Sequence, residues 1–314
     1  MAALVHGVLG ERVSAVRRFP TGLQHFVYDV ALSRGSSVVA RIAGPGPRAE
    51  RAIGSGLAWT RILRGVGVPV AEVLHGSPSP APPFRPFAIL ERLEGSDLGH
   101  AHGALGEPER RRVAEAVCEI QRRIGRIPAP PGYGYVAAGQ TRAPCDSWPD
   151  FLRGLLAGGL RAVERGGVLS ASALPNLDAH LERIEPRLES VPPRLFFDDA
   201  TTKNVIVSGG RLSGIVDVDS LCVGDPLLAL GLTRTALVSL GEDTGYVDHQ
   251  ADVLGADAAE REALDLYAAI FCVVFLGEHG QRFNRGEPEE TDRDAIDRQR
   301  AALESLAGTL RRAK

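Results

Sequence analysis

The sequence predicts a segregated α+β fold, in which a strand-rich first third precedes a mainly helical remainder. Three observations predict it. Runs of β-branched and aromatic residues between glycine and proline turns are concentrated before residue 95. Apolar residues recur at helical spacing after that point, where one short hairpin interrupts them. Strands and helices do not alternate regularly and no internal repeat is evident, so a parallel sheet of βαβ units is not expected.

The first third is predicted to open with a helix and to continue as strands around a second helix. Residues 1–19 lack the leading basic region of a signal peptide and carry Glu11 early, so we interpret them as helical. FVYDVAL and SVVARIA, joined by SRGSS, predict a β-hairpin. GPGPRAE breaks the chain before the next helix, and the proline-rich segment 77–86 is a surface connection because proline donates no ladder hydrogen bond. The predicted strands lie at 26–32, 37–43, 67–74 and 87–95, and the second helix lies at 49–65.

After residue 95, apolar residues at helical spacing predict helices around a single hairpin. One helix begins near Glu107-Pro108, a typical helix start, and Pro186 is expected to kink or end the next. NVIV (204–207) and RLSGIVDV (211–218) flank SGG, which predicts the hairpin. The apolar helix positions are Val113, Val117, Ile120 and Ile124; Leu177, Leu181, Ile184 and Leu188; Leu264, Tyr267, Phe271, Val274 and Phe275; and Ile296, Leu303, Leu306 and Leu310.

Composition excludes several classes of protein. The 36 basic and 39 acidic residues give a net charge of −3, so no general attraction to nucleic acid or to an anionic membrane is expected. The longest apolar run, 266–276, is far shorter than the roughly 20 residues of a membrane span. The four cysteines form no CxxC pair, which favours buried thiols in a reducing, cytoplasmic compartment. HExxH, zinc-finger and GxSxG patterns are absent, so metal hydrolases and α/β-hydrolases are not expected.

The segment RLFFDDATTKNVIVSGGRLSGIVDVDSLCVGDP, residues 194–226, carries the residues of greatest chemical interest. Asp199 and Asn204 bracket the loop before the first hairpin strand, and Asp217 is expected to end the second strand. The hairpin can therefore bring Asn204 and Asp217 to the same end. Oxygen donors grouped beside a further carboxylate suit Mg²⁺. Phosphoryl transfer from a nucleotide needs such metal ligands, together with a carboxylate that orients the attacking hydroxyl.

This segment resembles the catalytic and metal loops of the aminoglycoside phosphotransferase and choline kinase-like family, relatives of the protein kinases. That family typically carries HGDxxxxN, a hairpin, I-D-[WF]-[ED] and GDP. The corresponding residues here are Phe197-Asp198-Asp199, Asn204, Asp217 and Gly224-Asp225-Pro226. The resemblance implies a bilobal protein kinase-like fold, with a β-rich nucleotide-binding lobe at 1–94 and a mainly helical lobe at 95–314. It also implies ATP-dependent transfer of the γ-phosphoryl group to a hydroxyl of a small molecule, with Mg²⁺ as cofactor.

The same resemblance implies roles for individual residues. Asp199 would orient the acceptor hydroxyl and accept its proton, while Asn204 and Asp217 would bind Mg²⁺. Lys203 either steadies the transferring phosphoryl group or is an ordinary solvated loop residue. The expected nucleotide contacts come from three places. Gly22, Gln24 and His25 belong to a glycine-containing loop that binds phosphates, and Arg41 is the cation on a strand that pairs with phosphates. Glu91 and Leu93 belong to the hinge, whose backbone groups bind adenine. The donor is ATP, with GTP left open.

Three features depart from the family pattern. Phe197 and Asp198 replace the histidine and glycine of HGD, and the five-residue spacing to Asn204 selects Asp199 as the catalytic carboxylate. In the nucleotide loop, Gln24-His25 replaces Ser-Asn.

The third departure concerns the glutamate that usually holds the strand cation from the next helix. Counting back from GVPV leads to a position near Gly56, and the earlier Glu50 is suggested for this role. Asp219 is interpreted either as an additional acid of the metal site or as a turn cap beside Ser220.

Two other functions fit parts of the sequence. GPGPRA (44–49) after a strand matches the G-x-G-x-x-[GA] pattern of dinucleotide-binding oxidoreductases, but prolines stud the loop and no second half of a doubly wound sheet follows. A non-catalytic nucleotide-binding module of kinase fold would explain the altered HGD motif.

The acceptor is a hydroxylated small molecule whose identity the sequence leaves open. Between Arg234 and Arg261 there is no lysine or arginine, while acidic residues are frequent: Glu242, Asp243, Asp248, Asp252 and Asp257. Such a stretch attracts cations, which predicts an acceptor that carries an amine, such as an aminoglycoside or another amine-bearing molecule. A solvated loop would have the same composition. The oligomeric state is also left open.

Overall fold

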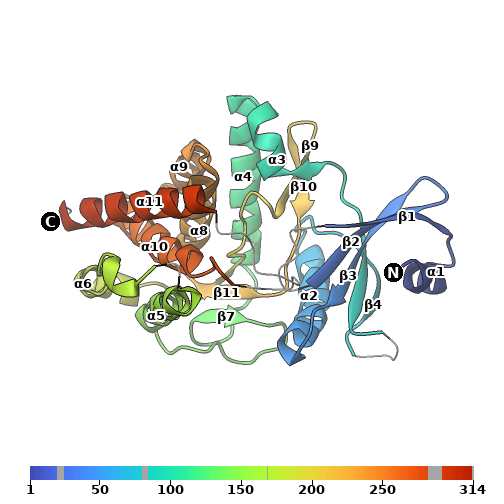
Figure 1. Cartoon of the computed structure of the whole chain (residues 1–314), viewed down its shortest axis with the longest axis horizontal. Coiled ribbons are helices and arrows are strands. Elements are labelled where there is room, and N and C mark those ends of the chain that lie inside the picture. The colour runs from blue at the N-terminus through green and yellow to red at the C-terminus, as the bar shows by residue number, and fades with distance from the viewer. Residues whose placement is uncertain (20–24, 80–83, 168, 282–291, 313–314) are drawn as a thin grey trace.

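The computed structural model describes residues 1–19, 25–79, 84–167, 169–281 and 292–312. A five-stranded antiparallel sheet lies at one end of the molecule, and helices with two small sheets form the rest (Figure 1). The predicted α+β fold class is therefore confirmed. Within the described ranges, no helix is both long and apolar enough to cross a membrane.

The N-terminal sheet has the strand order β1-β2-β3-β5-β4, and each neighbouring pair is antiparallel. The predicted hairpin is confirmed as β2 and β3, in which Val27 lies opposite Arg41. The elements of this part are α1 (Ala2–Leu9), β1 (Val13–Arg18), β2 (His25–Leu32), β3 (Ser37–Ala43), α2 (Pro47–Gly65), β4 (Val73–Ser77) and β5 (Phe87–Glu91).

Three predicted boundaries in this part are wrong. The strand predicted at 87–95 ends at Glu91. The first helix ends at Leu9, followed by Gly10 in a left-handed conformation (φ 70°), and residues 13–18 form β1. β1 is largely exposed and is held by backbone pairing to β2, so its side chains give little sign of a strand. The strand predicted at 67–74 begins only at Val73, because the residues before it pack into the core of the helical part. Residues 80–83 of the predicted proline-rich connection lie outside the described ranges.

The helical part contains two three-stranded antiparallel sheets, ordered β10-β9-β6 and β7-β11-β8. Helix α4 begins at Glu107 as predicted, and the helix predicted around 177–188 is divided at Ile184, with Pro186 in the first turn of α7. The helices are α3 (Leu98–Ala101), α4 (Glu107–Ile124), α5 (Trp148–Gly166), α6 (Asp178–Arg183), α7 (Glu185–Glu189), α8 (Leu227–Leu240), α9 (Gly245–Leu254), α10 (Ala258–Leu276) and α11 (Arg293–Arg312), with 3-10 turns at His102–Ala104 and Ala171–Ala173. The strands are β6 (Ser96–Asp97), β7 (Gly134–Val136), β8 (Arg194–Phe196), β9 (Val205–Ser208), β10 (Arg211–Ile215) and β11 (Leu221–Gly224).

Helix α2 joins the two parts of the molecule. Ile53 and Leu57 pack against the N-terminal sheet, whereas Trp59 and Leu63 belong to the large core of the helical part. Trp59 Nε1 also donates a hydrogen bond to the carbonyl of Val136 at 3.3 Å. Because both of its ends are anchored by buried apolar side chains, α2 holds the residues between them in a fixed place beside the helical part.

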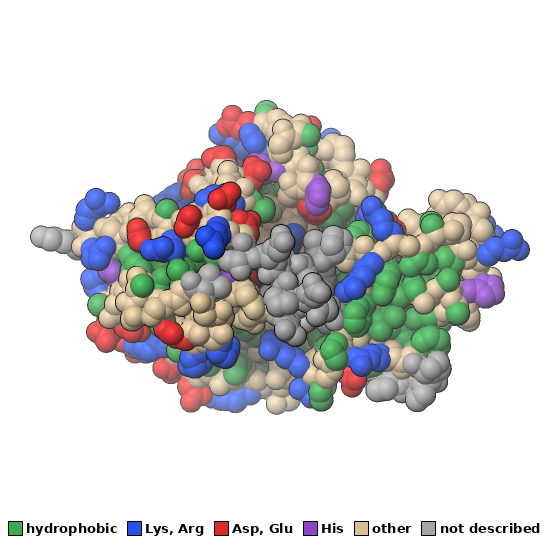
Figure 2. Space-filling model, in the orientation of Figure 1, with side chains coloured by type: hydrophobic (Ala, Val, Ile, Leu, Met, Phe, Trp, Pro, Cys, Tyr) green, Lys and Arg blue, Asp and Glu red, His purple; other side chains and the backbone are tan. Residues whose placement is uncertain are grey.

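The chain passes from the sheet to the helical part after β5. β6 pairs with β9 of the helical part, so the crossing lies between Glu91 and Ser96. The lobe division at residue 94 stays a prediction. Basic and acidic side chains are intermixed over the helical part on the face shown in Figure 2, in keeping with the small net charge.

Candidate active site

The loop between β8 and β9 contains Asp198, Asp199 and Asn204, and helix α4 holds its start in place. Gln121 on α4 binds both backbone groups of Phe197: its Nε2 donates to the carbonyl at 2.7 Å, and its Oε1 accepts from the N–H at 3.0 Å. The Phe197 side chain is buried in the core. Where the resembled family has histidine, this chain therefore has an apolar core residue with a backbone fixed by Gln121.

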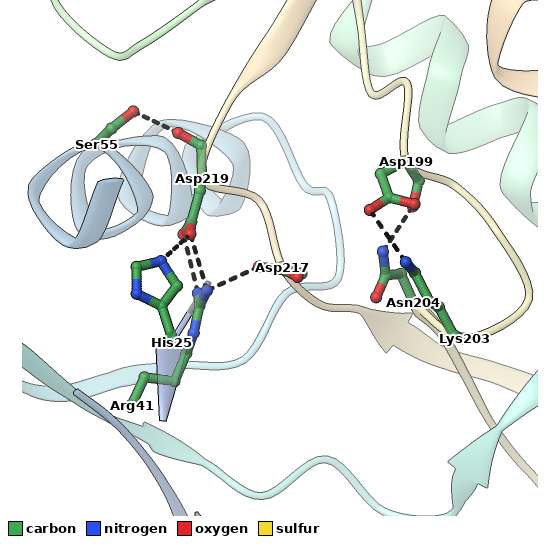
Figure 3. Close-up of polar contacts among 8 residues, drawn as sticks. All are labelled: His25, Arg41, Ser55, Asp199, Lys203, Asn204, Asp217 and Asp219. Atoms are coloured by element: carbon green, nitrogen blue, oxygen red, sulfur yellow. Dashed lines mark hydrogen bonds and ion pairs between the residues drawn. The ribbon is translucent and has the colours of Figure 1, made fainter. Parts of the chain in front are cut away.

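Asp199 is the more accessible of the two adjacent aspartates, with a side chain that is 32% exposed. Its Oδ1 accepts a hydrogen bond from Thr201 Oγ1 at 2.9 Å. Its carbonyl accepts one from Asn204 Nδ2 at 3.0 Å (Figure 3). Lys203 Nζ lies 3.9 Å from Asp199 Oδ2. Burial raises the pKa of Asp199, although the nearby Lys203 opposes the rise. A carboxylate with a raised pKa is a better proton acceptor.

Asp198 has a different environment. It is 8% exposed, and its carboxyl group hydrogen-bonds the hydroxyl of Tyr135. Burial, reinforced by the charge of Asp199, raises the pKa of Asp198 to about 7. The two aspartates are thus separated by their surroundings into a buried acid and an accessible carboxylate.

This environment predicts a pH-dependent effect of Asp198→Asn on stability. The folded protein keeps a proton on Asp198 up to about pH 7, whereas the unfolded chain releases it near pH 4. The wild type therefore loses stability as the pH rises between these values, and the Asp198→Asn variant, which has no proton to release at this position, does not lose this contribution. From pH 5 to pH 8, the free energy of unfolding of the variant should rise relative to that of the wild type by about 2–3 kcal/mol. Urea denaturation at both pH values measures this difference, and an equal difference at the two values would contradict it.

The β9–β10 hairpin sets the positions of Asn204 and Asp217. The N–H of Val216 donates to the carbonyl of Asn204 at 3.0 Å, so the two residues extend from neighbouring ends of the hairpin. The second strand ends at Ile215, earlier than predicted, which leaves Asp217 in the following loop. Asp217 is the one non-glycine residue with positive φ (65°) in the described ranges. Such strain costs of order 1–3 kcal/mol and clusters at functional sites.

The donor set of these two residues fits a magnesium ion. The Asn204 amide nitrogen bonds the carbonyl of Asp199, and its oxygen is directed away from that residue (Figure 3). The Asp217 side chain is about half exposed. Amide and carboxylate oxygens are the ligands that Mg²⁺ prefers, completed by phosphate and water oxygens.

Arg41 reaches this site from β3. Its guanidinium donates to both carboxylate oxygens of Asp219, at 2.9 Å and 2.8 Å, and to Asp217 Oδ1 at 2.7 Å (Figure 3). His25 Nε2, at the start of β2, lies 2.9 Å from Asp219 Oδ2. Burial alone would lower the pKa of Arg41, but the charges of Asp219 and Asp217 outweigh it and raise the pKa further. The partner suggested from the sequence, Glu50 of α2, is wrong: Asp219 occupies that role in the structure.

The other predicted nucleotide contacts are only partly visible. Gly22 and Gln24 lie outside the described residues. Glu91 ends β5, where its N–H donates to the carbonyl of Glu72 at 2.9 Å. The carbonyl of Leu93 accepts a hydrogen bond from Arg92 Nη1 at 2.9 Å. Glu91 therefore is the last residue of β5 and Leu93 lies just after that strand, and their contact with adenine stays a prediction.

Asp225 of the Gly224-Asp225-Pro226 segment is buried and has a structural role. Its Oδ1 accepts the N–H of Leu227 at 3.0 Å, and its Oδ2 accepts the hydroxyl of Tyr267 at 2.9 Å. Tyr267 in turn accepts a hydrogen bond from Trp148 Nε1 at 2.9 Å. A Cβ atom at Gly224 would lie 2.1 Å from the Trp148 ring, so glycine is required there.

The acidic stretch is less uncompensated than its sequence suggests. Arg234 pairs with Asp248 at 2.8 Å, and Arg261 pairs with Asp252 at 2.6 Å, because the flanking arginines fold back onto the stretch. Asp257 caps α10 by accepting the N–H of Glu260. The two remaining acids, Glu242 and Asp243, have no arginine or lysine partner among residues that the structure describes. Glu242 Oε2 lies 3.8 Å from the buried His102 Nδ1.

The dinucleotide-binding alternative is contradicted by the connection around GPGPRA. This segment does join β3 to α2, but both neighbours of β3 in the sheet, β2 and β5, run antiparallel to it. A dinucleotide-binding unit needs parallel neighbouring strands across the helix.

Sequence reasoning missed three residues that shape the site. Gln121 fixes the backbone of Phe197, Thr201 bonds Asp199, and Ser55 bonds the carbonyl of Asp219 at 2.5 Å. Thr201 lies inside the Asp-x₄-Asn segment and could have been found from it. Gln121 and Ser55 come from distant helices, and nothing in their local pattern marks them.

Comparisons with known proteins place the whole chain in one structural group. A thermostable mutant of aminoglycoside phosphotransferase APH(4)-Ia, in a ternary complex with AMP-PNP and hygromycin B, is 16% identical, with a TM-score of 0.68 over 100% of this chain and 99% of that chain. The GDP complex of wild-type aminoglycoside 2′-phosphotransferase-IIIa is 14% identical, with a TM-score of 0.67 over 98% of this chain and 96% of the other. A protein assigned as a fructosamine-3-kinase from Thermobifida fusca is 19% identical, with a TM-score of 0.62 over 97% and 98%. A search of curated proteins returned no match.

At these identities, the structural relatives establish the kinase-like fold that the resemblance implied. The sequence itself matches the profile of the phosphotransferase enzyme family over residues 15–267, which include the sheet from within β1 onward, the β8–β9 loop and the loop after β10. The match therefore covers every described residue of the candidate site. The chain belongs to the phosphotransferase enzyme family.

Proposed function

We propose that this chain is an ATP-dependent small-molecule kinase, which transfers a γ-phosphoryl group to a hydroxyl of its acceptor. The observation that carries the proposal is the contact of Arg41 with Asp217, beside the hairpin end that bears Asn204, whose amide binds the carbonyl of Asp199. Family membership supports the same class of reaction. Relatives of similar fold were solved with AMP-PNP and with GDP, so both ATP and GTP are candidate donors.

In the proposed reaction, the acceptor oxygen forms a bond to the γ-phosphorus while the bond from that phosphorus to the β,γ-bridging oxygen breaks. Asp199 orients the acceptor hydroxyl and accepts its proton. The guanidinium of Arg41 is suited to binding phosphate oxygens. Lys203, the cation nearest Asp199, steadies the transferring group. Asn204 and Asp217 would hold Mg²⁺, which neutralises phosphate charge when bound.

The direct test is turnover by the purified chain with Mg²⁺, ATP or GTP, and a panel of hydroxylated acceptors that includes amino sugars. Nucleoside diphosphate release and the mass of the phosphorylated product are measured together. Acceptor-dependent release with a matching product supports the proposal. Nucleotide binding without turnover on any acceptor would instead favour the non-catalytic kinase-fold module.

The acceptor is expected to carry an amine near the hydroxyl that is phosphorylated. Glu242 and Asp243, which follow α8, support this expectation. Glu242 lies near His102 in the 3-10 turn that follows α3. Gly99 of α3 donates its N–H to the carbonyl of Thr202, which is in the same loop as the proposed catalytic Asp199. Carboxylates without cationic partners pair with ammonium groups. Matched acceptors with and without the amine should differ in kcat/KM, and the difference should shrink at high salt and in a Glu242→Gln, Asp243→Asn variant. Equal kcat/KM values at every salt concentration would contradict the expectation.

A further inference from the structure

Asp219, in the loop after β10, is hydrogen-bonded to three other elements: β2 and β3 through its carboxylate and α2 through its backbone carbonyl. Arg41 of β3 donates two hydrogen bonds to it, and His25 of β2 lies 2.9 Å from its Oδ2. Its own carbonyl accepts a hydrogen bond from Ser55 Oγ of α2 at 2.5 Å, and the same Oγ accepts the N–H of Ala138 at 2.9 Å. The side chain of Asp219 is 18% exposed. The loop after β10 is thereby tied to the sheet and to α2.

Helix α2 leaves room for this carboxylate because it has a glycine there. A Cβ atom at Gly56 would lie 2.3 Å from Asp219 Oδ1, closer than two such atoms can approach. The φ of Gly56 is not in the left-handed region, so backbone conformation does not explain the glycine. Absence of a side chain at position 56 is instead what lets the Asp219 carboxylate lie against the helix.

Helix α2 itself has no acidic residue that pairs with Arg41. Glu50 is the only acidic residue of the helix and belongs to its first turn. Gly56 lies six positions further along the chain, a rise of about 9 Å along the helix. The Arg41 side chain is 12% exposed, and a guanidinium so enclosed needs a carboxylate partner to keep its charge and orientation.

We propose that Asp219 is the positioning residue for Arg41, supplying from the loop after β10 the carboxylate that the helix lacks at Gly56. This inference rests on the proposed function, in which Arg41 binds the phosphates. As a consequence, one loop holds both the Arg41 guanidinium, through Asp219, and Asp217, which lies two residues before Asp219. The two-pronged bond from Asp219 leaves the third Arg41 contact, to Asp217, as the one that phosphate oxygens replace.

The test moves the carboxylate from the loop to the helix. Asp219→Ala should raise the Kd of a fluorescent ATP analogue, in the presence of Mg²⁺, by about 10- to 100-fold, the usual loss for a residue that orients a ligand-binding group. Adding Gly56→Asp to this variant places an aspartate oxygen near the vacated position of Asp219 Oδ1, and nucleotide affinity should recover at least tenfold relative to Asp219→Ala. Gly56→Asp alone should weaken binding, because the two carboxylates would then collide.

Matched controls separate positioning from general damage. Glu50→Gln, on the same helix, should bind nucleotide as the wild type does. The Mg²⁺ concentration for half-maximal nucleotide binding should stay close to that of the wild type in both Asp219→Ala and the double variant, since Asp219 does not bind the metal in this proposal. Circular dichroism and thermal unfolding confirm folding. If Asp219→Ala is unfolded, Asp219→Ser, whose shorter side chain leaves the space beside Gly56 free, takes its place with and without Gly56→Asp.

Three results would overturn the inference. Asp219→Ala could bind nucleotide with the affinity of the wild type, the double variant could fail to recover affinity, or the Mg²⁺ requirement could rise strongly in both, which would make Asp219 a metal ligand. A wild-type chain that binds no nucleotide is a different outcome, because it would contradict the proposed function itself.

Discussion

Replacing Asp199 by asparagine is expected to lower kcat by about 10²–10⁴-fold, the usual contribution of a positioned general base. Asparagine keeps an oxygen that can accept the hydrogen bond from Thr201 and keeps the backbone carbonyl that binds Asn204, so the loop should retain its shape. What it loses is the capacity to accept the proton of the acceptor hydroxyl. Steady-state turnover, with Kd for the nucleotide measured alongside, should therefore show a fall in kcat with little change in nucleotide affinity.

Asp198→Asn is the matched control for this prediction, because it removes the neighbouring carboxylate from the same loop. The buried Asp198 faces Tyr135 and is largely closed to solvent, so its replacement should change turnover far less. If Asp198→Asn is the inactive variant and Asp199→Asn stays active, the assignment of roles to the two aspartates is reversed.

The part of the site that sequence reasoning predicted is the part governed by local geometry. SGG between two short apolar strands specifies a hairpin, and a hairpin fixes which residues emerge at its open end. Asn204 and Asp217 could therefore be paired across 13 residues without knowledge of the rest of the fold. Arg41 was assigned by resemblance, and the structure brings it to the same place.

The part that could not be predicted depends on contacts between distant segments. Asp219 pairs with Arg41 across 178 residues. The pairing is possible because Gly56 of α2 has no side chain to occupy the space of the Asp219 carboxylate. No local sequence pattern predicts that Gly56 and Asp219 lie side by side in the folded chain. β1 was missed for a related reason, since its backbone pairing with β2 outweighs a local pattern that suits a helix equally well. Gln121 acts through backbone atoms of Phe197, which have no sequence signature.

Asp217→Ala is expected to abolish the Mg²⁺-dependent thermal stabilisation of the protein by nucleotide. A ligand at 100 times its Kd stabilises the folded state by about 2.7 kcal/mol, which for a chain of this length is a rise of several degrees in Tm. Without the Asp217 carboxylate, one of the two proposed metal ligands is lost and occupancy falls at the same nucleotide concentration. Tm is measured for both proteins with ATP and Mg²⁺, and again with ATP and a chelator.

The conformation of Asp217 calls for a second variant beside this one. Its φ of 65° is tolerated by asparagine better than by alanine, so Asp217→Ala also strains the loop, whereas Asp217→Asn removes the charge and keeps the backbone. Both variants should lose the nucleotide-dependent rise in Tm, and only Asp217→Ala should also show a lower Tm without ligand. Asp146→Ala, which removes a largely exposed carboxylate paired with Arg142 at the surface, should keep the full rise. An unchanged rise in Tm with ATP and Mg²⁺ in Asp217→Asn would remove Asp217 from the metal site.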